Sequence, residues 1–335
     1  MKVTRHWRLV LGLNVLLLAA CGAAWAQTCY TAGDMEKATQ TALTNTGQGY
    51  FDMVAHGDSA SLRQNAIPSL AANFSGIEEA VKDNQAALSG AQGAARPPFL
   101  LKAEGATAQA HAEFLCGVFG AHGQTADSAV FMIPNLPPGS YAVVIMDART
   151  AGSPYTVTFV LEQQGGDWKL GGLYIKPVQA AGHDGNWFAE QARAYKTKGQ
   201  FHNAWFYYQE ARDLLAPVSF MSTMVTDQLY DEAQNLRPAD VPWGGSTTDL
   251  AAGAKTFKLT EMFPTVVGKE LELVVKYQSA DVSNTAAAFQ DNTTVMKTLL
   301  AKVPELREAF AGIVARAVEP SGRDYGTMLE MKSIK

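Results

Sequence analysis

The segment YTVTFVLEQQGGDWKLGGLYIKP, residues 155–177, has the clearest structural pattern in the chain. Tyr155, Val157 and Phe159 alternate with polar side chains, as in a strand of a sheet with one buried face. A glycine pair within QGGD, residues 164–167, separates this run from a second one and predicts a β-hairpin. The segment therefore predicts an antiparallel sheet.

Four more strand-sized runs lie before this hairpin and are separated by Gly, Pro, Asn and Asp turn signals. They are FLLKAEG (99–105), QAHAEFLCGVFG (109–120), SAVFMIP (128–134) and SYAVVIMDAR (140–149). With the two runs of the hairpin they predict a six-stranded, curved antiparallel meander.

Helical patterns occupy the region before the strands. The apolar spacing predicts a helix over 35–54 that is interrupted or loosened around TNTGQG, and a short helix to Asn65, capped by Asp58 or Ser59 and ended by Pro68. Ser75 with Glu78 three residues later is a capping-box pattern, which predicts a further helix to about residue 88. Helices followed by strands indicate the α+β class.

This order of elements, ending in the hairpin with Trp168 at its turn, resembles the NTF2-like (cystatin-like cone) domains over residues 34–178. The resemblance implies that the helices pack into the concave side of the sheet. It also implies that the cone could bind a small ligand or carry isomerase or hydrolase chemistry in a pocket.

Residues 186–237 have a helical pattern. Part of this region resembles one tetratricopeptide repeat (TPR) in its offsets, carried by Ala192, Tyr195, Gly199, Ala204, Tyr208 and Ala211. The segment is either a TPR-like hairpin docked on the sheet domain or an ordinary pair of helices. The four aromatics of residues 205–208 circle such a helix, so core or interface packing is expected of them.

A Pro/Gly/Ser-rich linker is predicted at 238–255, and a small α+β domain at 256–335. Strands are expected at 256–263 and 269–280, followed by a helix over 293–310 that Pro304 could split. A closing hairpin completes a ββαββ pattern.

The first residues read as a secretory leader, because a basic start precedes an apolar run too short to span a bilayer. Two cleavage sites compete. Ala24-Trp25-Ala26 fits an ordinary signal peptidase and would remove residues 1–26. Leu18-Ala19-Ala20-Cys21 resembles a bacterial lipobox, whose cleavage would remove residues 1–20 and leave a lipid on Cys21. Either reading predicts an exported, periplasmic protein, which in the second case is a membrane-anchored lipoprotein.

Cys29 and Cys116 are the remaining cysteines, and an oxidising compartment would permit one disulfide between them. The alternative is that Cys116 is a free, buried apolar residue, because it shares a strand face with Phe114 and Val118.

The formal charge is −5, and it becomes more negative once the three basic residues of the leader are removed. An acidic chain argues against a nucleic-acid partner. No metal-ligand, nucleotide-binding or hydrolase signature occurs in the sequence, so no cofactor and no metal are predicted.

His111 and Glu113 are the weak candidates for acid/base chemistry, because residues two apart in a strand share a face. Asp147 in another predicted strand could join them. The alternative is that His111 and Glu113 lie on a solvated face.

The sequence thus favours a binding or scaffolding protein of the cell envelope, whose partner is an unknown envelope protein or a small ligand. Any membrane contact would be made through the lipid. The alternative is an NTF2-like enzyme that uses the His/acid pair, and the sequence leaves open which is right.

Overall fold

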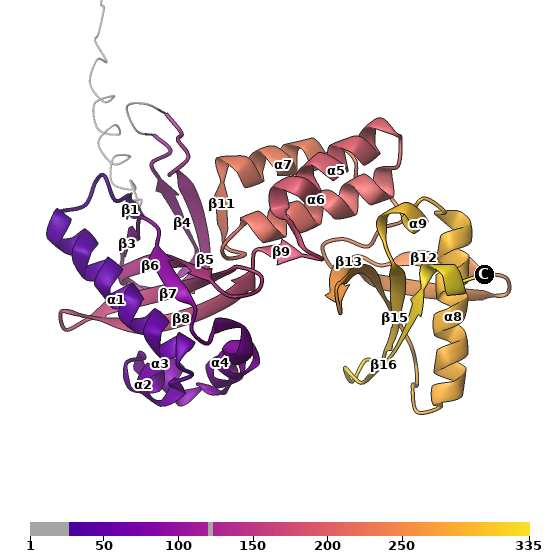
Figure 1. The fold of residues 1–335 in the computed structure, drawn as a ribbon, viewed down its shortest axis with the longest axis horizontal. Coiled ribbons are helices and arrows are strands. Elements are labelled where there is room, and N and C mark those ends of the chain that lie inside the picture. Colours follow the sequence, from indigo (N-terminus) through magenta and orange to yellow (C-terminus); the bar gives the residue numbers. More distant parts are fainter. Residues whose placement is uncertain (1–26, 120–122) are drawn as a thin grey trace, which may run out of the picture.

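The computed structural model describes residues 27–119 and 123–335, so both predicted cleavage sites and Cys21 lie outside the described residues. The fold is α+β, with helices and largely antiparallel sheets, as the sequence predicts (Figure 1). No helix in the described part of the chain is long and apolar enough to cross a membrane.

The first sheet has six strands within the described residues. Their order is β1-β3-β6-β7-β8, and β2 pairs with β6 beside β3. The strands are β1 (Thr28–Tyr30), β2 (Gln92–Ala95), β3 (Phe99–Ala103), β6 (Gly139–Arg149), β7 (Tyr155–Gln164) and β8 (Asp167–Pro177). The hairpin predicted at residues 164–167 is confirmed, because Gly165 and Gly166 take φ values of 60° and 100° between β7 and β8. Residues other than glycine seldom adopt two such values in succession.

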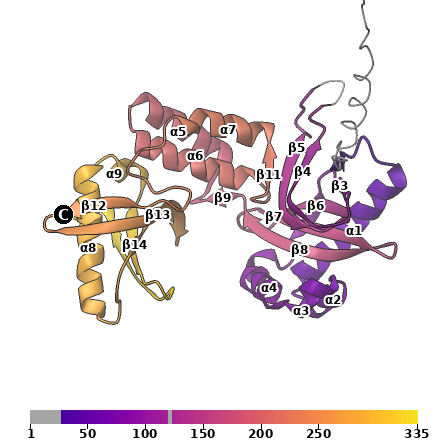
Figure 2. The same ribbon diagram turned by 180° about the vertical axis from the view of Figure 1, so that it is seen from behind.

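The predicted single meander is wrong, although all six predicted runs form strands. β4 (Gln109–Cys116) and β5 (Ala129–Leu136) leave the first sheet and form a second sheet with β11 (Met221–Thr223). Figure 2 shows β5 between β11 and β4. A distant segment of the chain therefore completes this sheet.

Strand β6 is buried on both faces. Val143 and Ile145 belong to the apolar cluster under the second sheet, whereas Val144 and Met146 belong to the cluster under the helices. The neighbouring β7 is also covered on both faces, since Thr158 and Thr156 are 0% and 2% exposed. The expectation of one solvated face along β7 is therefore wrong.

Four helices pack on the first sheet: α1 (Lys37–Ala55), α2 (Ser59–Gln64), α3 (Pro68–Ala72) and α4 (Ser75–Leu88). Helix α1 continues through TNTGQG, contrary to the prediction. Gly47 is the reason, because its missing side chain lets the helix lie against the side chain of Val144. Asp58 caps α2 as predicted, by accepting a hydrogen bond from the Ser61 amide.

Two other predictions about helix ends are wrong. The capping box at Ser75 does not form, because Phe74 holds the N-cap position and makes no side-chain cap. Pro68 does not end α2; it occupies the first turn of α3, where a missing amide hydrogen costs nothing.

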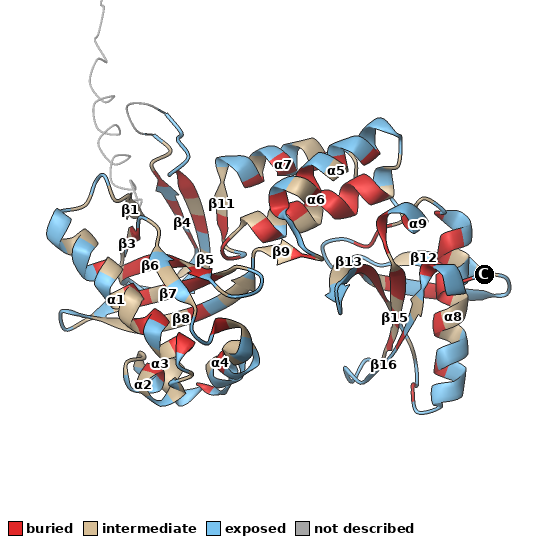
Figure 3. Cartoon of the chain, viewed as in Figure 1, coloured by how far each residue is buried: buried red, intermediate tan, exposed pale blue. Residues whose placement is uncertain are grey.

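The next segment contains β9 (Gln179–Ala180), β10 (His183–Asp184), α5 (Gly185–Thr197), α6 (Phe201–Leu215) and α7 (Met224–Gln234). Helix α6 is buried along most of its length, including Trp205, Phe206, Tyr207 and Tyr208 (Figure 3). These aromatics pack in a core, as expected from the sequence.

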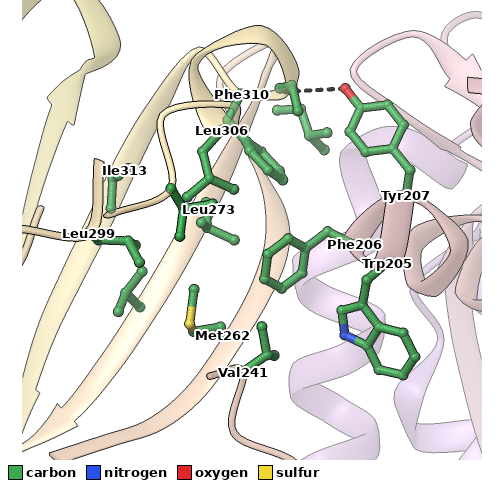
Figure 4. Packing of buried hydrophobic residues seen from close by; sticks show 14 of the residues in the cluster. Trp205, Phe206, Tyr207, Val241, Met262, Leu273, Leu299, Leu306, Phe310 and Ile313 are labelled. Atoms are coloured by element: carbon green, nitrogen blue, oxygen red, sulfur yellow. Dashed lines mark hydrogen bonds between the residues drawn. The ribbon is translucent and has the colours of Figure 1, made fainter. Parts of the chain in front are cut away.

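The core around α6 extends into the C-terminal sheet. The rings of Phe206 and Phe310 lie 5.9 Å apart, and the Tyr207 hydroxyl donates a 2.7 Å hydrogen bond to the carbonyl oxygen of Ala309 (Figure 4). The helical segment therefore shares its main core with the C-terminal sheet, whereas the sequence led us to expect it on the first domain.

The C-terminal region is β-β-β-α-β-β, with one strand more than predicted. The sheet order is β12-β13-β14-β15-β16, formed by Thr248–Ala252, Lys255–Val267, Glu270–Gln278, Gly312–Val318 and Asp324–Glu330. The additional strand β12 lies inside the predicted linker. Between β14 and β15 run α8 (Thr285–Lys302) and α9 (Leu306–Ala309), and a 3₁₀ turn at Met331–Ser333 follows β16.

The connection from β14 to β15 crosses over the sheet through α8 and α9. Strands β14 and β15 are parallel, so the chain needs a long connection between them, which α8 supplies. Pro304 lies between α8 and α9, as predicted, but α8 begins at Thr285, eight residues before the predicted start.

Cys29 of β1 and Cys116 of β4 form a disulfide, with Cα atoms 5.0 Å apart. It joins the edge of the first sheet to the edge of the second. A disulfide of this kind is compatible with an exported protein. Cys116 is fully buried, but it is bonded to Cys29, so the alternative of a free, buried cysteine is wrong.

Gly47 and Gly49 provide a matched test of the packing of α1. A side chain at position 47 would collide with Val144, whereas a Cβ at position 49 meets nothing within 4 Å. We expect Gly47→Ala to lower the free energy of unfolding by about 1–3 kcal/mol. Gly49→Ala should raise it by about 0.5–1 kcal/mol, because alanine favours the helix. Urea unfolding measures both, and equal effects would contradict the close contact.

Candidate functional site

A cleft of about 840 Å³ opens between the two sheets of the first domain. Tyr30 lies at one side of it, Phe99 of β3 and Ile145 of β6 belong to the first sheet, and Met221 of β11 belongs to the second. A volume of this size is ordinary for a small-molecule site.

The cleft exists because the two sheets are joined at one edge and packed together only in part. The Cys29–Cys116 disulfide holds β1 against β4, and a shared apolar cluster joins the sheets through residues such as Phe114, Phe131 and Val143. The chain that follows β1, together with Pro217 after α6, lines the remaining space.

Several polar groups of the cleft are satisfied by the chain itself. The Thr31 hydroxyl and amide donate 2.6 Å and 3.0 Å hydrogen bonds to the Asp34 carboxylate, and these bonds hold the pKa of Asp34 below its usual value. The Ser128 hydroxyl accepts from the Thr125 amide and donates to the Gly117 carbonyl oxygen.

Arg96 brings a cation to the cleft, but its charge is already neutralised. Its guanidinium forms a two-pronged ion pair with Asp147, with Nε 3.0 Å and Nη2 2.7 Å from the carboxylate oxygens. Such planar pairs, with two parallel hydrogen bonds, are directional and are stronger than hydrogen bonds between neutral groups. The cleft therefore offers apolar surface and polar groups that are mostly paired within the chain, with the exposed carboxylate of Asp127 at its rim.

The three candidate acid/base residues do not converge on this cleft. His111 and Glu113 are exposed on the outer face of β4, opposite the buried Ala112 and Phe114. Asp147 lies on β6 in the first sheet and pairs with Arg96. The solvated-face alternative describes His111 and Glu113 correctly.

Most of the space between the helices and the first sheet is filled by the chain's own side chains. Tyr50, Phe51 and Phe159 are among the buried residues there. The Tyr50 hydroxyl contacts the carbonyl oxygens of Asn65 and Trp168, at 3.0 Å and 3.1 Å. The larger space, of about 840 Å³, therefore lies on the opposite side of the sheet from the one that the NTF2-like resemblance implied. A more open pocket of about 450 Å³, lined by Ala42, Leu100 and Trp168, remains on the implied side, at one end of α1.

Over residues 27–119 and 123–335, no three His, Cys, Asp or Glu side chains cluster so that they could hold a metal ion. The cleft has no local sequence signature as a whole, because its walls come from five separate parts of the chain, namely 29–34, 96–99, 115–119 with 123–128, Ile145 and 215–223. Only the apolar run of β6 carries a local signal, since a strand that is apolar at successive positions has both faces covered.

Glu210 of α6 is a titratable group that the sequence did not single out. It is partly buried near the junction of α6 with β8. Burial, with repulsion from Asp213, raises its pKa to about 7, and Lys176 opposes the shift. Lys176 of β8 donates hydrogen bonds to the carbonyl oxygens of Asp213 and Ala216, at 2.6 Å and 3.2 Å, and so ties the end of α6 to the first sheet.

No family model, no curated protein and no solved structure matches this chain.

Glu210 predicts a pH-dependent stability. Between about pH 4.5 and pH 7, Glu210 keeps its proton in the folded protein but loses it in the unfolded chain. The free energy of unfolding should therefore fall as the pH rises through this range. Glu210→Gln should match the wild type below this range and exceed it above, by roughly 1–3 kcal/mol. Urea titrations at several pH values test this, with exposed Glu79→Gln as the control. Parallel profiles for wild type and Glu210→Gln would contradict the assignment.

Proposed function

We propose that this chain is an exported, non-catalytic binding protein of the bacterial envelope, and that its ligand is a small, largely apolar molecule. The observation that carries the proposal is the cleft of about 840 Å³ between the two sheets, whose Arg96 and Asp34 are already paired within the chain. A ligand there gains mainly from contact with Phe99, Ile145 and Met221.

The absence of a convergent catalytic set favours binding over catalysis. Among the described residues, His111 and Glu113 face outward on β4 and Asp147 is held by Arg96, so these groups do not meet around one reacting atom. General acid/base catalysis needs such groups within hydrogen-bonding reach of the substrate.

We also propose which fold families the first domain and the helical segment resemble. We assign residues 34–178 to an NTF2-like domain, supported by helices α1 to α4 packed on a sheet that ends in the β7–β8 hairpin. We assign residues 186–237 to a TPR-like segment, supported by the antiparallel-packed pair α5 and α6. The separate sheet β11-β5-β4 is an addition to the NTF2-like plan.

The predicted secretory leader supports the proposed location of the protein in the envelope. Either cleavage site delivers the protein to the periplasm, where the Cys29–Cys116 disulfide can form. Lipidation of Cys21 would hold the binding domain near a membrane, where apolar ligands concentrate.

Filling the cleft tests the proposal. Ala32 lines it and is only partly buried, so Ala32→Trp should place an indole in the cleft while the fold is kept. Binding of the fluorescent apolar probe N-phenyl-1-naphthylamine should weaken by about tenfold or more. The matched control is Ala286→Trp on α8, an exposed alanine far along the chain from the cleft, which should bind the probe like the wild type.

Fluorescence titration gives the affinities, and thermal unfolding confirms that both variants are folded. Equal probe binding by the wild type and by folded Ala32→Trp would show that the apolar site lies elsewhere. Failure of the wild type to bind the probe would remove the support for an apolar ligand.

A further inference from the structure

The pocket of about 450 Å³ lies between the beginning of α1 and the first sheet. Ala38, Thr39 and Ala42 of α1 line it. The large buried side chains of this helix begin only at Leu43 and continue with Tyr50. Small side chains at the start of the helix therefore leave open the space that large ones fill farther along. Figure 1 shows α1 running across this sheet.

Four side chains on adjacent strands form the sheet side of this pocket. Lys102 of β3 lies opposite Ser140 of β6. The antiparallel register of β6 with β7 places Ser140 beside Gln163. Gln163 in turn lies opposite Trp168 of β8. One basic, two polar and one aromatic side chain thus follow one another in a line across the sheet.

Lys102 brings a positive charge to the pocket. Within residues 27–119 and 123–335 it forms no ion pair with a carboxylate, and no acidic side chain of these residues lines the pocket. The ammonium nitrogen lies 5.1 Å from the centre of the Tyr30 ring, whose face attracts a cation. Because a ring supplies no oxygen acceptor, this contact positions the ammonium group and leaves its N–H donors for a ligand.

Neutral hydrogen-bond donors and apolar surface complete the lining. Among the described residues, the hydroxyls of Thr39 and Ser140 and the side-chain amide of Gln163 make no hydrogen bond to another protein group. Each of them can donate a hydrogen bond to an oxygen atom of a ligand. Trp168 is half-buried against the core under the helices, so its indole is held in place, and Leu100 adds apolar surface beside it.

We propose that this pocket binds a small organic anion, namely a monocarboxylate with a flat apolar body. The carboxylate pairs with Lys102 and accepts hydrogen bonds from Ser140 and Gln163. The flat body lies along Trp168. One lysine with neutral donors around it matches a single negative charge, since the ammonium group acts as a point charge. Apolar walls with a few convergent polar groups are typical of small-molecule sites.

This pocket is separate from the cleft of about 840 Å³ between the two sheets. Strand β3 contributes to both, because Lys102 lines the pocket whereas Phe99 lines the cleft on the other side of the sheet. The two sites also differ in charge, since Arg96 of the cleft is paired with Asp147. The anion site therefore does not depend on the proposed apolar ligand, and both molecules can be bound at once.

Isothermal titration calorimetry of the full chain tests the proposal with naphthalene-1-acetate and its neutral analogue naphthalene-1-acetamide. The two compounds share the flat body and differ in charge. The wild type should bind the acetate about fivefold or more tightly than the acetamide. Lys102→Gln should lose this preference, because the acetate has lost its cation. Lys258→Gln is the matched control, since Lys258 is an exposed lysine on β13 of the C-terminal sheet, and it should keep the preference.

Two further variants separate this site from the cleft. Ala32→Trp, which fills the cleft, should bind the acetate like the wild type, and Lys102→Gln should bind N-phenyl-1-naphthylamine like the wild type. Circular dichroism confirms that both variants are folded. The proposal would be overturned by a wild type that binds no acetate or binds both compounds equally, by a preference that persists in Lys102→Gln, or by loss of acetate binding in folded Ala32→Trp.

Discussion

The burial of β6 on both faces is the constraint on which the first domain depends. Its alternate residues enter two separate clusters, with Val144 and Met146 under the helices and Val143 and Ile145 under the second sheet. Burying one such side chain contributes roughly 1.5–3 kcal/mol, so neither covering layer can leave without a large cost. Gly47 serves this arrangement, because it brings α1 close to Val144. The cleft lies on the side of β6 that the second sheet covers, where Ile145 forms part of its wall.

Much of the local structure could be predicted from the sequence, because it is encoded in short periodicities and turn residues. The β7–β8 hairpin, the α2 cap at Asp58 and the break at Pro304 all follow from neighbouring residues. The division into two sheets could not be predicted, since alternation shows only that one face is covered. The burial of Thr158 illustrates the limit, because a polar residue is covered here by a part of the fold that no local pattern specifies.

The candidate site was harder to predict than the fold, for a related reason. Its walls combine Tyr30, Phe99, Ile145 and Met221, which lie far apart in the chain and have no chemistry that marks them as a set. His111 and Glu113 attracted notice because they are titratable and adjacent in a strand, yet the burial of Ala112 and Phe114 between and beside them turns both outward. The helical segment connects the parts, since β11 completes the second sheet while α6 packs with Phe310 in the C-terminal core.

The proposed binding function requires that the space between the two sheets takes an apolar ligand. The decisive measurement is a structure of the protein purified from its native source, with the material kept free of added apolar compounds. We expect density for a bound apolar molecule in contact with Phe99, Ile145 and Met221, with the Arg96–Asp147 ion pair intact beside it. A cleft that has closed on its own side chains, or an apolar molecule bound elsewhere on the chain, would contradict it.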